Sequence, residues 1–132
     1  AQPVVSRSPV GSLVLAHNGN LFNLEKLRER FSLEYADAYG ANSDSHLMAR
    51  CVAQALVRHK GDLPTAAKAV FDCCEGAFSV LLGAGDCLIA ARDRFGIRPL
   101  CLGRTDSGYW VFASETSALD IVGAQLIRHL EP

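Results

Sequence analysis

The sequence predicts an α+β fold, with amphipathic helices in the first half of the chain and antiparallel hairpins in the second. Between residues 24 and 74, apolar side chains recur at the spacing of helices that bury one face. From residue 77 onward, short β-rich runs alternate with segments rich in Gly, Asp and Pro, which is typical of hairpins. The chain has 132 residues, 49% hydrophobic and 20% charged, so we expect one globular domain with one core.

The first element that we expect is a strand over residues 11–17, ending at the turn signal Asn18-Gly19. Asn23 then caps a first helix, because its side chain can accept a backbone hydrogen bond. The apolar side chains of this helix share one face: Leu24, Leu27 and Phe31. Its polar side chains are expected to face water: Glu25, Lys26, Arg28 and Glu29.

A second helix opens at Ser43-Asp44-Ser45 and ends at Lys60-Gly61. Its apolar residues recur at helical spacing: Leu47, Met48, Cys51, Val52, Ala55 and Leu56. A third helix follows, in which Pro64 is acceptable within the first turn. Its buried stripe precedes Gly76 and consists of Ala67, Val70, Phe71 and Cys74.

The second half is predicted to be an antiparallel meander. Four β-rich runs are separated by turn segments: residues 77–82, 87–92, 100–104 and 109–114. Ser114 is then expected to cap a short helix through Leu119 and Ile121. Residues 125–130 return as a last strand.

Composition excludes several classes of function. Thirteen basic and fourteen acidic side chains give a net charge of −1, which does not favour nucleic acid or an anionic membrane as a partner. A small neutral or zwitterionic ligand fits better. No apolar run approaches the ~20 residues of a membrane-spanning helix, and residues 1–7 do not resemble a secretory signal.

The cysteines predict neither a metal site nor a disulfide framework. Their number is odd and no C-x-x-C pair occurs: Cys51, Cys73, Cys74, Cys87 and Cys101. We therefore expect reduced, buried thiols in a cytoplasmic protein, with no metal and no cofactor in this chain.

Two short motifs each allow a structural and a chemical interpretation. Asn18-Gly19 can simply form a tight turn, or its side-chain amide and glycine N–H can converge as two donors on a developing oxyanion. Asp44 can simply complement the start of its helix, or its carboxylate can bind the ammonium group of a substrate.

Four segments, in this order and with these gaps, resemble class II glutamine amidotransferases: residues 16–21 (Ala-His-Asn-Gly-Asn-Leu), 43–45 (Ser-Asp-Ser), 92–100 (Arg-Asp-Arg-Phe-Gly-Ile-Arg-Pro-Leu) and 113–115 (Ala-Ser-Glu). Within that superfamily the chain is most similar to amidophosphoribosyltransferases, and the similarity covers nearly its whole length. Asparagine synthetases are the nearest alternative, but their first motif usually has Glu where this chain has Asn20.

The resemblance implies an N-terminal-nucleophile hydrolase-like sandwich of antiparallel sheets flanked by helices, incomplete at the N-terminus. Residues 1–132 would then be a partial glutamine amidotransferase type-2 domain. In this family an N-terminal cysteine attacks the side-chain amide of glutamine, with its own α-amino group as general base. The ammonia passes to a phosphoribosyltransferase domain of the same parent chain, where Mg²⁺ is expected, and makes phosphoribosylamine for purine biosynthesis. The parent is expected to be a homo-oligomer.

The resemblance also assigns roles to particular residues. The side-chain amide of Asn18 and the N–H of Gly19 would form the oxyanion hole, and Asp44 would bind the α-ammonium of glutamine. We expect His17 and Asn20 to support the turn. Residues 92–100 are interpreted as a salt-bridged turn without a catalytic role.

Two departures from the family pattern matter. The nucleophile and the arginine loop that would hold the substrate carboxylate lie, in the family, upstream of the segment matched by residues 1–3, so we expect the chain alone to be inactive. The family often has Glu where this chain has His46, which makes the start of the helix less acidic. A non-catalytic glutamine-binding or scaffold module is therefore a further alternative.

Overall fold

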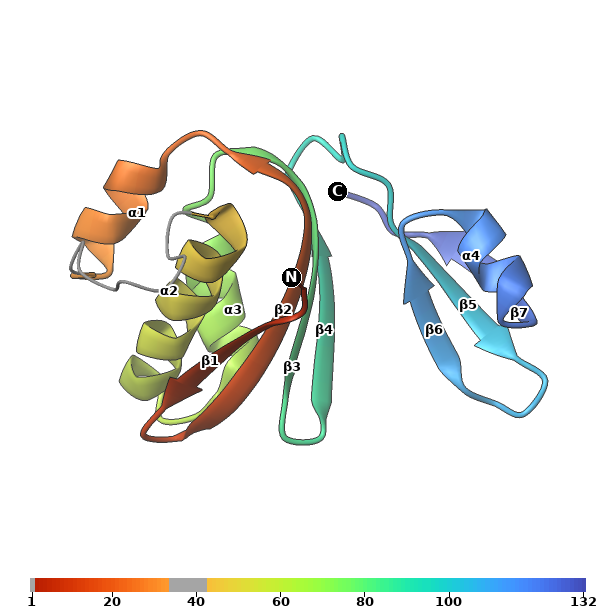
Figure 1. The fold of residues 1–132 in the computed structure, drawn as a ribbon, viewed down its shortest axis with the longest axis horizontal. Coiled ribbons are helices and arrows are strands. Elements are labelled where there is room, and N and C mark those ends of the chain that lie inside the picture. The colour runs from red at the N-terminus through yellow and green to blue at the C-terminus, as the bar shows by residue number, and fades with distance from the viewer. Residues whose placement is uncertain (1, 34–42) are drawn as a thin grey trace.

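The computed structural model describes residues 2–33 and 43–132. They form a four-stranded antiparallel sheet in the order β1-β2-β3-β4 and a three-stranded antiparallel sheet in the order β6-β5-β7 (Figure 1). The strands are β1 (Val4–Ser8), β2 (Gly11–Leu21), β3 (Gly76–Ala84), β4 (Cys87–Arg92), β5 (Cys101–Thr105), β6 (Trp110–Ala113) and β7 (Ala124–His129). The helices are α1 (Leu24–Arg30), α2 (Asp44–Arg58), α3 (Leu63–Phe71) and α4 (Thr116–Ile121).

The larger sheet buries one face under α2 and α3 because its strands alternate (Figure 1). Along β2, Leu13 and Leu15 are buried and Val14 between them is exposed. Their partners on β3 repeat this pattern, with Leu15 opposite the buried Leu82. One contiguous core results between sheet and helices, and it holds most of the buried apolar side chains.

The helices start and stop largely where the sequence predicts. Ser43 caps α2 by accepting the His46 backbone N–H on its Oγ. Just after α2, Lys60 and Gly61 both adopt positive φ, of 53° and 89°, and so end the helix. Asp62 caps α3, in whose first turn Pro64 stands.

The smaller sheet has its own small core. Cys101, Leu119 and Ala124 are buried together, so α4 covers one face of β5 and β7. Gly103 lets α4 approach closely, because a Cβ there would lie 3.0 Å from both methyl groups of Leu119. The opposite face of this sheet is turned toward the helix-free face of the larger sheet (Figure 1).

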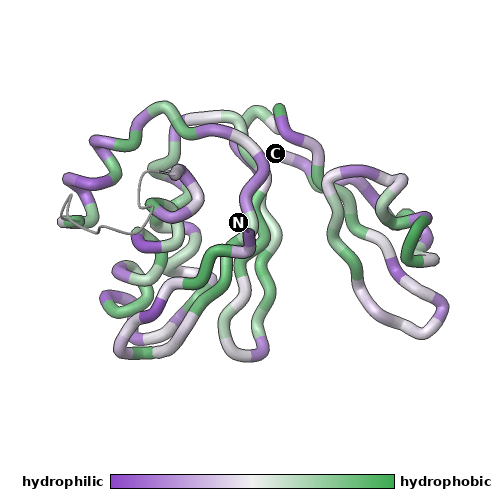
Figure 2. Tube along the Cα trace, in the orientation of Figure 1, coloured by the Kyte–Doolittle hydropathy of each residue, from purple (hydrophilic) through white to green (hydrophobic). Residues whose placement is uncertain are grey.

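The two sheets meet at only one end. A hollow of about 300 Å³ between them is lined by Ala16, Asn18 and Leu81 on one side and by Leu100, Phe112 and Ser114 on the other. Beyond it, apolar side chains on the facing strands remain exposed: Val5 60%, Val14 42%, Leu88 57% and Trp110 57%. Figure 2 shows hydrophobic residues along β3 and β4, the strands that border the space between the sheets.

Three predictions about strands are corrected. The sequence analysis did not predict β1, which pairs with β2 from Val4 opposite Leu15 to Ser8 opposite Gly11. It ended the first strand at Asn18-Gly19, whereas β2 runs on to Leu21 because these residues pair with β3. The four later strands are not one meander, because β4 belongs to the first sheet and β5 to the second.

Three predictions about side chains are also wrong. Asn23 stands at the N-cap of α1 but makes no cap bond, since its amide binds the backbone of Cys73 and Glu75 instead. Arg28 is buried, not water-facing. The N-cap of α4 is Glu115 rather than Ser114, and no side chain caps that helix.

Candidate functional site

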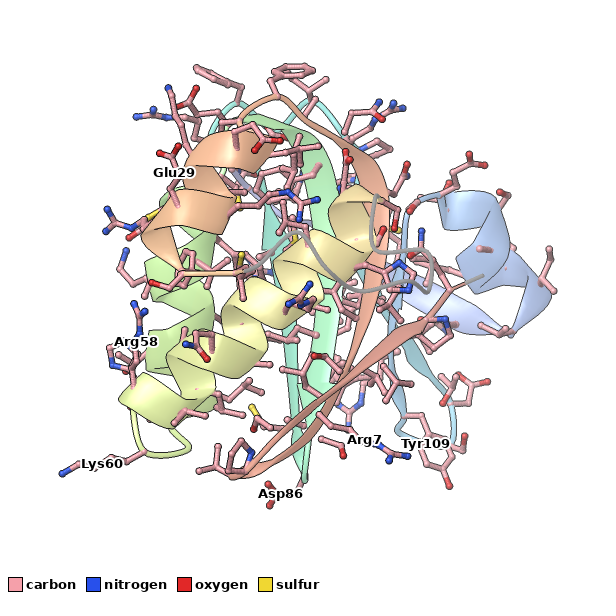
Figure 3. All side chains as sticks on the ribbon, turned by 60° about the vertical axis from the view of Figure 1, so that its left-hand side comes forward. Arg7, Glu29, Arg58, Lys60, Asp86 and Tyr109 are labelled. Atoms are coloured by element: carbon pink, nitrogen blue, oxygen red, sulfur yellow. The ribbon has the colours of Figure 1, made fainter. Side chains whose placement is uncertain are left out.

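The last four residues of β2 form the centre of the candidate site. Asn18 and Gly19 lie within the strand, opposite Ser79 and Phe78 of β3, and do not form a turn. The turn interpretation of this dipeptide is therefore wrong. The charged side chains Arg7, Lys60 and Asp86 mark the other end of the sheet and its helices in Figure 3. The site lies at the opposite end, where β2 finishes and α2 begins.

Gly19 is required by the backbone at this point. Its φ is 142°, and a Cβ would lie 2.0 Å from the Ala77 carbonyl oxygen. No side chain fits at that distance, and the positive φ is itself unfavourable for other residues. The glycine therefore brings two strands unusually close beside the Asn18 amide.

Asp44 is tied to the end of the same strand. It is the first residue of α2, is half-buried, and its Oδ2 accepts the Leu21 backbone N–H at 2.6 Å. Among the described residues, the hydrogen bond that this carboxylate accepts is made at Oδ2. Gly19 and Leu21 are two residues apart, roughly 6.6 Å along a strand. This spacing suits a ligand with an ammonium at one end and an amide at the other.

His17 lies beneath the site, between β2 and α2. It is 8% exposed, its Nδ1 is 3.1 Å from the Ser45 Oγ, and its ring packs 6.3 Å from the ring of Phe78. Burial lowers the pKa of His17, the Asp44 carboxylate raises it and the Arg98 guanidinium lowers it, with a net lowering. The imidazole is therefore neutral near pH 7 and links the strand to the helix.

Gln2 was missed by the sequence analysis. Its carboxamide accepts the His17 backbone N–H and donates to the His17 carbonyl at 2.7 Å, as a neighbouring strand would. It thus fixes the backbone immediately before Asn18. No pattern in the sequence indicates this contact, since Gln2 precedes the first predicted element by nine residues.

Ser114 reaches the site from the second sheet. Its Oγ accepts a hydrogen bond from the Asn18 Nδ2 at 3.2 Å, across 96 residues of sequence. The sequence analysis assigned this serine to a helix cap, which is a local role. A contact between two sheets depends on topology and cannot be found from local patterns.

The segment after β4 binds backbone atoms and is not a salt-bridged turn. Arg92 donates to the carbonyls of Arg98, Gly96 and Leu130. The buried Asp93 carboxylate accepts backbone N–H groups from β3 and from its own loop: Phe78, Phe95 and Ile97. This segment joins the two sheets near the C-terminal strand.

Electrostatics support the same interpretation of the loop. Burial opposes ionisation of Asp93, but its backbone hydrogen bonds outweigh burial and hold the pKa of this carboxyl below its usual value. Asp93 is thus an ionised structural anchor of this loop.

The buried Cys51 and Cys74 are not activated nucleophiles. Burial raises the pKa of the Cys51 and Cys74 thiols to about 12, so both stay protonated near pH 7. Cys101 is also buried, and its Sγ donates to the Ala113 carbonyl. Among residues 2–33 and 43–132, no three side chains gather that could hold a metal ion, and no helix is long and apolar enough to cross a membrane.

The chain is similar to a known domain family and to known enzymes. A glutamine amidotransferase domain model matches residues 1–121. The amidophosphoribosyltransferase of Synechocystis sp. is 38% identical over 99% of this chain and 27% of its own length, and that of Archaeoglobus fulgidus is 34% identical over 100% and 28%. The chain thus spans little more than a quarter of these relatives.

Solved structures agree with the sequence matches. Glutamine phosphoribosylpyrophosphate amidotransferase of B. subtilis, in complex with ADP and GMP, superposes with a TM-score of 0.82 at 34% identity, over 99% of this chain and 28% of that one. This likeness confirms the predicted α+β fold class of the N-terminal-nucleophile type. With most of its length matched by the family model and its fold shared with a solved member, the chain belongs to the glutamine amidotransferase domain family.

Proposed function

We propose that this chain is the glutamine-hydrolysing part of an amidophosphoribosyltransferase, an enzyme that makes phosphoribosylamine from phosphoribosyl pyrophosphate and glutamine in purine biosynthesis. The proposal depends on one observation above all. Asp44, which is far in sequence from Asn18 and Gly19, lies with them at the end of β2 in a chain of the matching family.

The role of each residue depends on whether the charge that it contacts on glutamine is present before the reaction or develops during it. As the amide carbon of glutamine becomes tetrahedral, negative charge develops on its oxygen, and the Asn18 amide and Gly19 N–H donate to it. The Asp44 carboxylate binds the α-ammonium group, which is charged before the reaction starts. Asn18 and Gly19 therefore stabilise the transition state, and Asp44 holds the substrate.

The nucleophile in this proposal is a cysteine that precedes the chain, at the mature N-terminus of the parent protein. Its thiol proton passes to its own α-amino group, the thiolate attacks, and that proton leaves with the departing ammonia. Water then releases glutamate from the acyl-enzyme. The high pKa of Cys51 and Cys74 supports an external nucleophile.

The ammonia acceptor belongs to another part of the parent. We propose a phosphoribosyltransferase domain in the same chain, with Mg²⁺ bound there, in a cytoplasmic homo-oligomer. Relatives nearly four times as long as this chain support a second domain.

The proposal predicts that the 132-residue chain alone releases no glutamate from glutamine above background, because the thiolate and its base are missing. The full-length protein should consume glutamine and phosphoribosyl pyrophosphate together, in a coupled glutamate assay. Glutaminase activity that co-purifies with the isolated chain would contradict the external nucleophile. Dependence on aspartate and ATP would identify an asparagine synthetase-like enzyme instead.

Substitutions of Asn18 and Asp44 should change the glutamine kinetics of the full-length protein in different ways. Asn18→Ala should lower kcat with glutamine by about 10²–10³ with little change in KM. Asp44→Asn should chiefly raise KM for glutamine, because it weakens ground-state binding. Both variants should keep the ammonia-dependent reaction, which bypasses this site.

Asp62→Asn is the matched control for Asp44→Asn, because Asp62 caps α3 and lies outside the site. It should leave glutamine kinetics unchanged. If Asp44→Asn lowered only stability and left KM as it was, the helix-start interpretation of Asp44 would be the better one.

A further inference from the structure

One hydrogen bond connects the candidate oxyanion donor to the other sheet. The Asn18 side chain points toward the second sheet, where its Nδ2 donates to the Ser114 Oγ at 3.2 Å. Ser114 directly follows β6 and precedes Glu115, the N-cap of α4. Because no side chain caps α4, the serine hydroxyl is not needed by that helix.

The hydrogen bond to Ser114 still allows the Asn18 amide to donate to a ligand. A side-chain amide nitrogen carries two hydrogens, so one can bind Ser114 while the other is directed at a ligand. Asn18 itself is exposed and would otherwise turn freely among rotamers. The bond therefore fixes the amide plane before the reaction, and a pre-oriented donor costs no reorganisation when charge develops.

The surroundings of Ser114 favour one orientation. The hollow of about 300 Å³ between the sheets is lined by Asn18, Ser79, Phe112 and Ser114, with Ser79 3% exposed. On the side of the smaller sheet, the other residues that line the hollow are apolar: Leu100, Phe112 and Ala113. Among the described residues, the Ser114 hydroxyl is the partner that the structure gives to Asn18.

We infer that Ser114 is a positioning residue for glutamine hydrolysis, because it holds the Asn18 amide in its donating orientation. The inference rests on the proposed function. Ser114 does not touch substrate, and its effect passes entirely through Asn18. It also makes the oxyanion hole depend on the contact between the two sheets.

The test uses the full-length protein with glutamine and with ammonia as nitrogen donors. Ser114→Ala should lower kcat with glutamine about 3- to 10-fold, the effect of one lost hydrogen bond, with KM nearly unchanged. Ser114→Thr retains the hydroxyl and should keep most activity. Ser117→Ala, on the exposed side of α4, is the matched control and should behave as wild type. The ammonia-dependent rate should be unaffected throughout.

A double-mutant cycle with Asn18→Ala gives the sharper readout. If Ser114 acts through Asn18, Ser114→Ala should cause no further loss of kcat in the Asn18→Ala background. Additive losses, or equal losses with glutamine and ammonia, would overturn the inference and indicate a general structural role. Ser114→Cys keeps a side chain of similar shape, but its thiol is a weak hydrogen-bond acceptor, so this variant should also lose activity. It replaces Ser114→Ala as the test if the alanine variant folds poorly.

The outcomes separate this inference from the proposed function. If Asn18→Ala lowers kcat with glutamine and Ser114→Ala does not, the positioning role of Ser114 is overturned. The assignment of Asn18 to the oxyanion hole then stands. If Asn18→Ala leaves kcat with glutamine unchanged, both the oxyanion role of Asn18 and the positioning role of Ser114 are overturned, since no donor would then need to be positioned.

Discussion

At the scale of single residues, glycine decides how close two strands can come at the site. Gly19 faces the backbone of Ala77 and Phe78, and Gly76 faces that of Asn20 in the same way, where a Cβ would lie 2.2 Å from the carbonyl oxygen. Neither contact can be relieved by moving a side chain. The end of β2 is thus shaped by main-chain atoms, and the Asn18 amide lies directly beside it.

Gly19→Ala should therefore abolish glutamine-dependent activity while Gly85→Ala should not. Both glycines have positive φ, but a Cβ at Gly85 meets nothing within 4 Å. Gly85→Ala should cost about 1–2 kcal/mol of stability from backbone strain alone. Gly19→Ala adds the collision of its Cβ with the backbone of β3. Kinetics with glutamine and ammonia in the full-length protein would check this, and a Gly19→Ala variant with normal glutamine kinetics would contradict it.

At the scale of elements, the site depends on how β2 and α2 are joined. Asp44 binds the Leu21 N–H, and Ser45 on the next position binds the ring of His17. Gln2 fixes the backbone of His17 from the other side. Asp44, Ser45 and His17 thus join the strand to the helix, and Gln2 holds the strand on the side of the N-terminus.

The pH dependence of this junction follows from His17. Its pKa is lowered in the folded protein, mainly by burial, from an unfolded value of about 6.5. The unfolded state then binds more protons, so stability is constant above that pH and falls as pH drops below it. Hydrogen exchange of β2 amides in the full-length protein, corrected for intrinsic rates, should show protection falling as the pH drops below about 6.5.

His17→Gln should weaken this fall, because glutamine does not titrate. His129→Gln is the control, since His129 is exposed on β7 and should keep the wild-type pH dependence. An unchanged pH profile in His17→Gln would show that another group is responsible.

Elements with strong local signals were predictable, and those set by tertiary pairing were not. Residues 43–61 carry a cap, a helical apolar period and a stop, so α2 was found nearly to its ends. Asn18-Gly19 carries a turn signal, yet pairing with β3 keeps it in a strand. The choice of Asn18, Gly19 and Asp44 came from family resemblance, and their spatial gathering could not come from sequence spacing alone.

At the scale of the whole molecule, the two sheets meet at the Asn18–Ser114 contact and near Arg92, and diverge elsewhere (Figures 1 and 2). The larger sheet buries one face under helices, and its other face carries Val5, Val14 and Leu88. The smaller sheet turns Phe112 toward that face, and Trp110, two residues earlier on β6, lies on the same side of its sheet. Apolar side chains on facing sheets that stay exposed favour association.

The isolated 132-residue chain should therefore self-associate and bind a hydrophobic dye. Replacing Val5 and Leu88, which are 60% and 57% exposed on the helix-free face, with Ser should reduce both effects. The matched control replaces Phe22 and Ile121, which are 78% and 86% exposed but lie outside the strands, and it should change little. Size-exclusion chromatography and dye fluorescence over a concentration series would measure this. A wild-type monomer that does not bind the dye would contradict this prediction. It would show that the two sheets close on each other, since these side chains would then be removed from water by packing against one another.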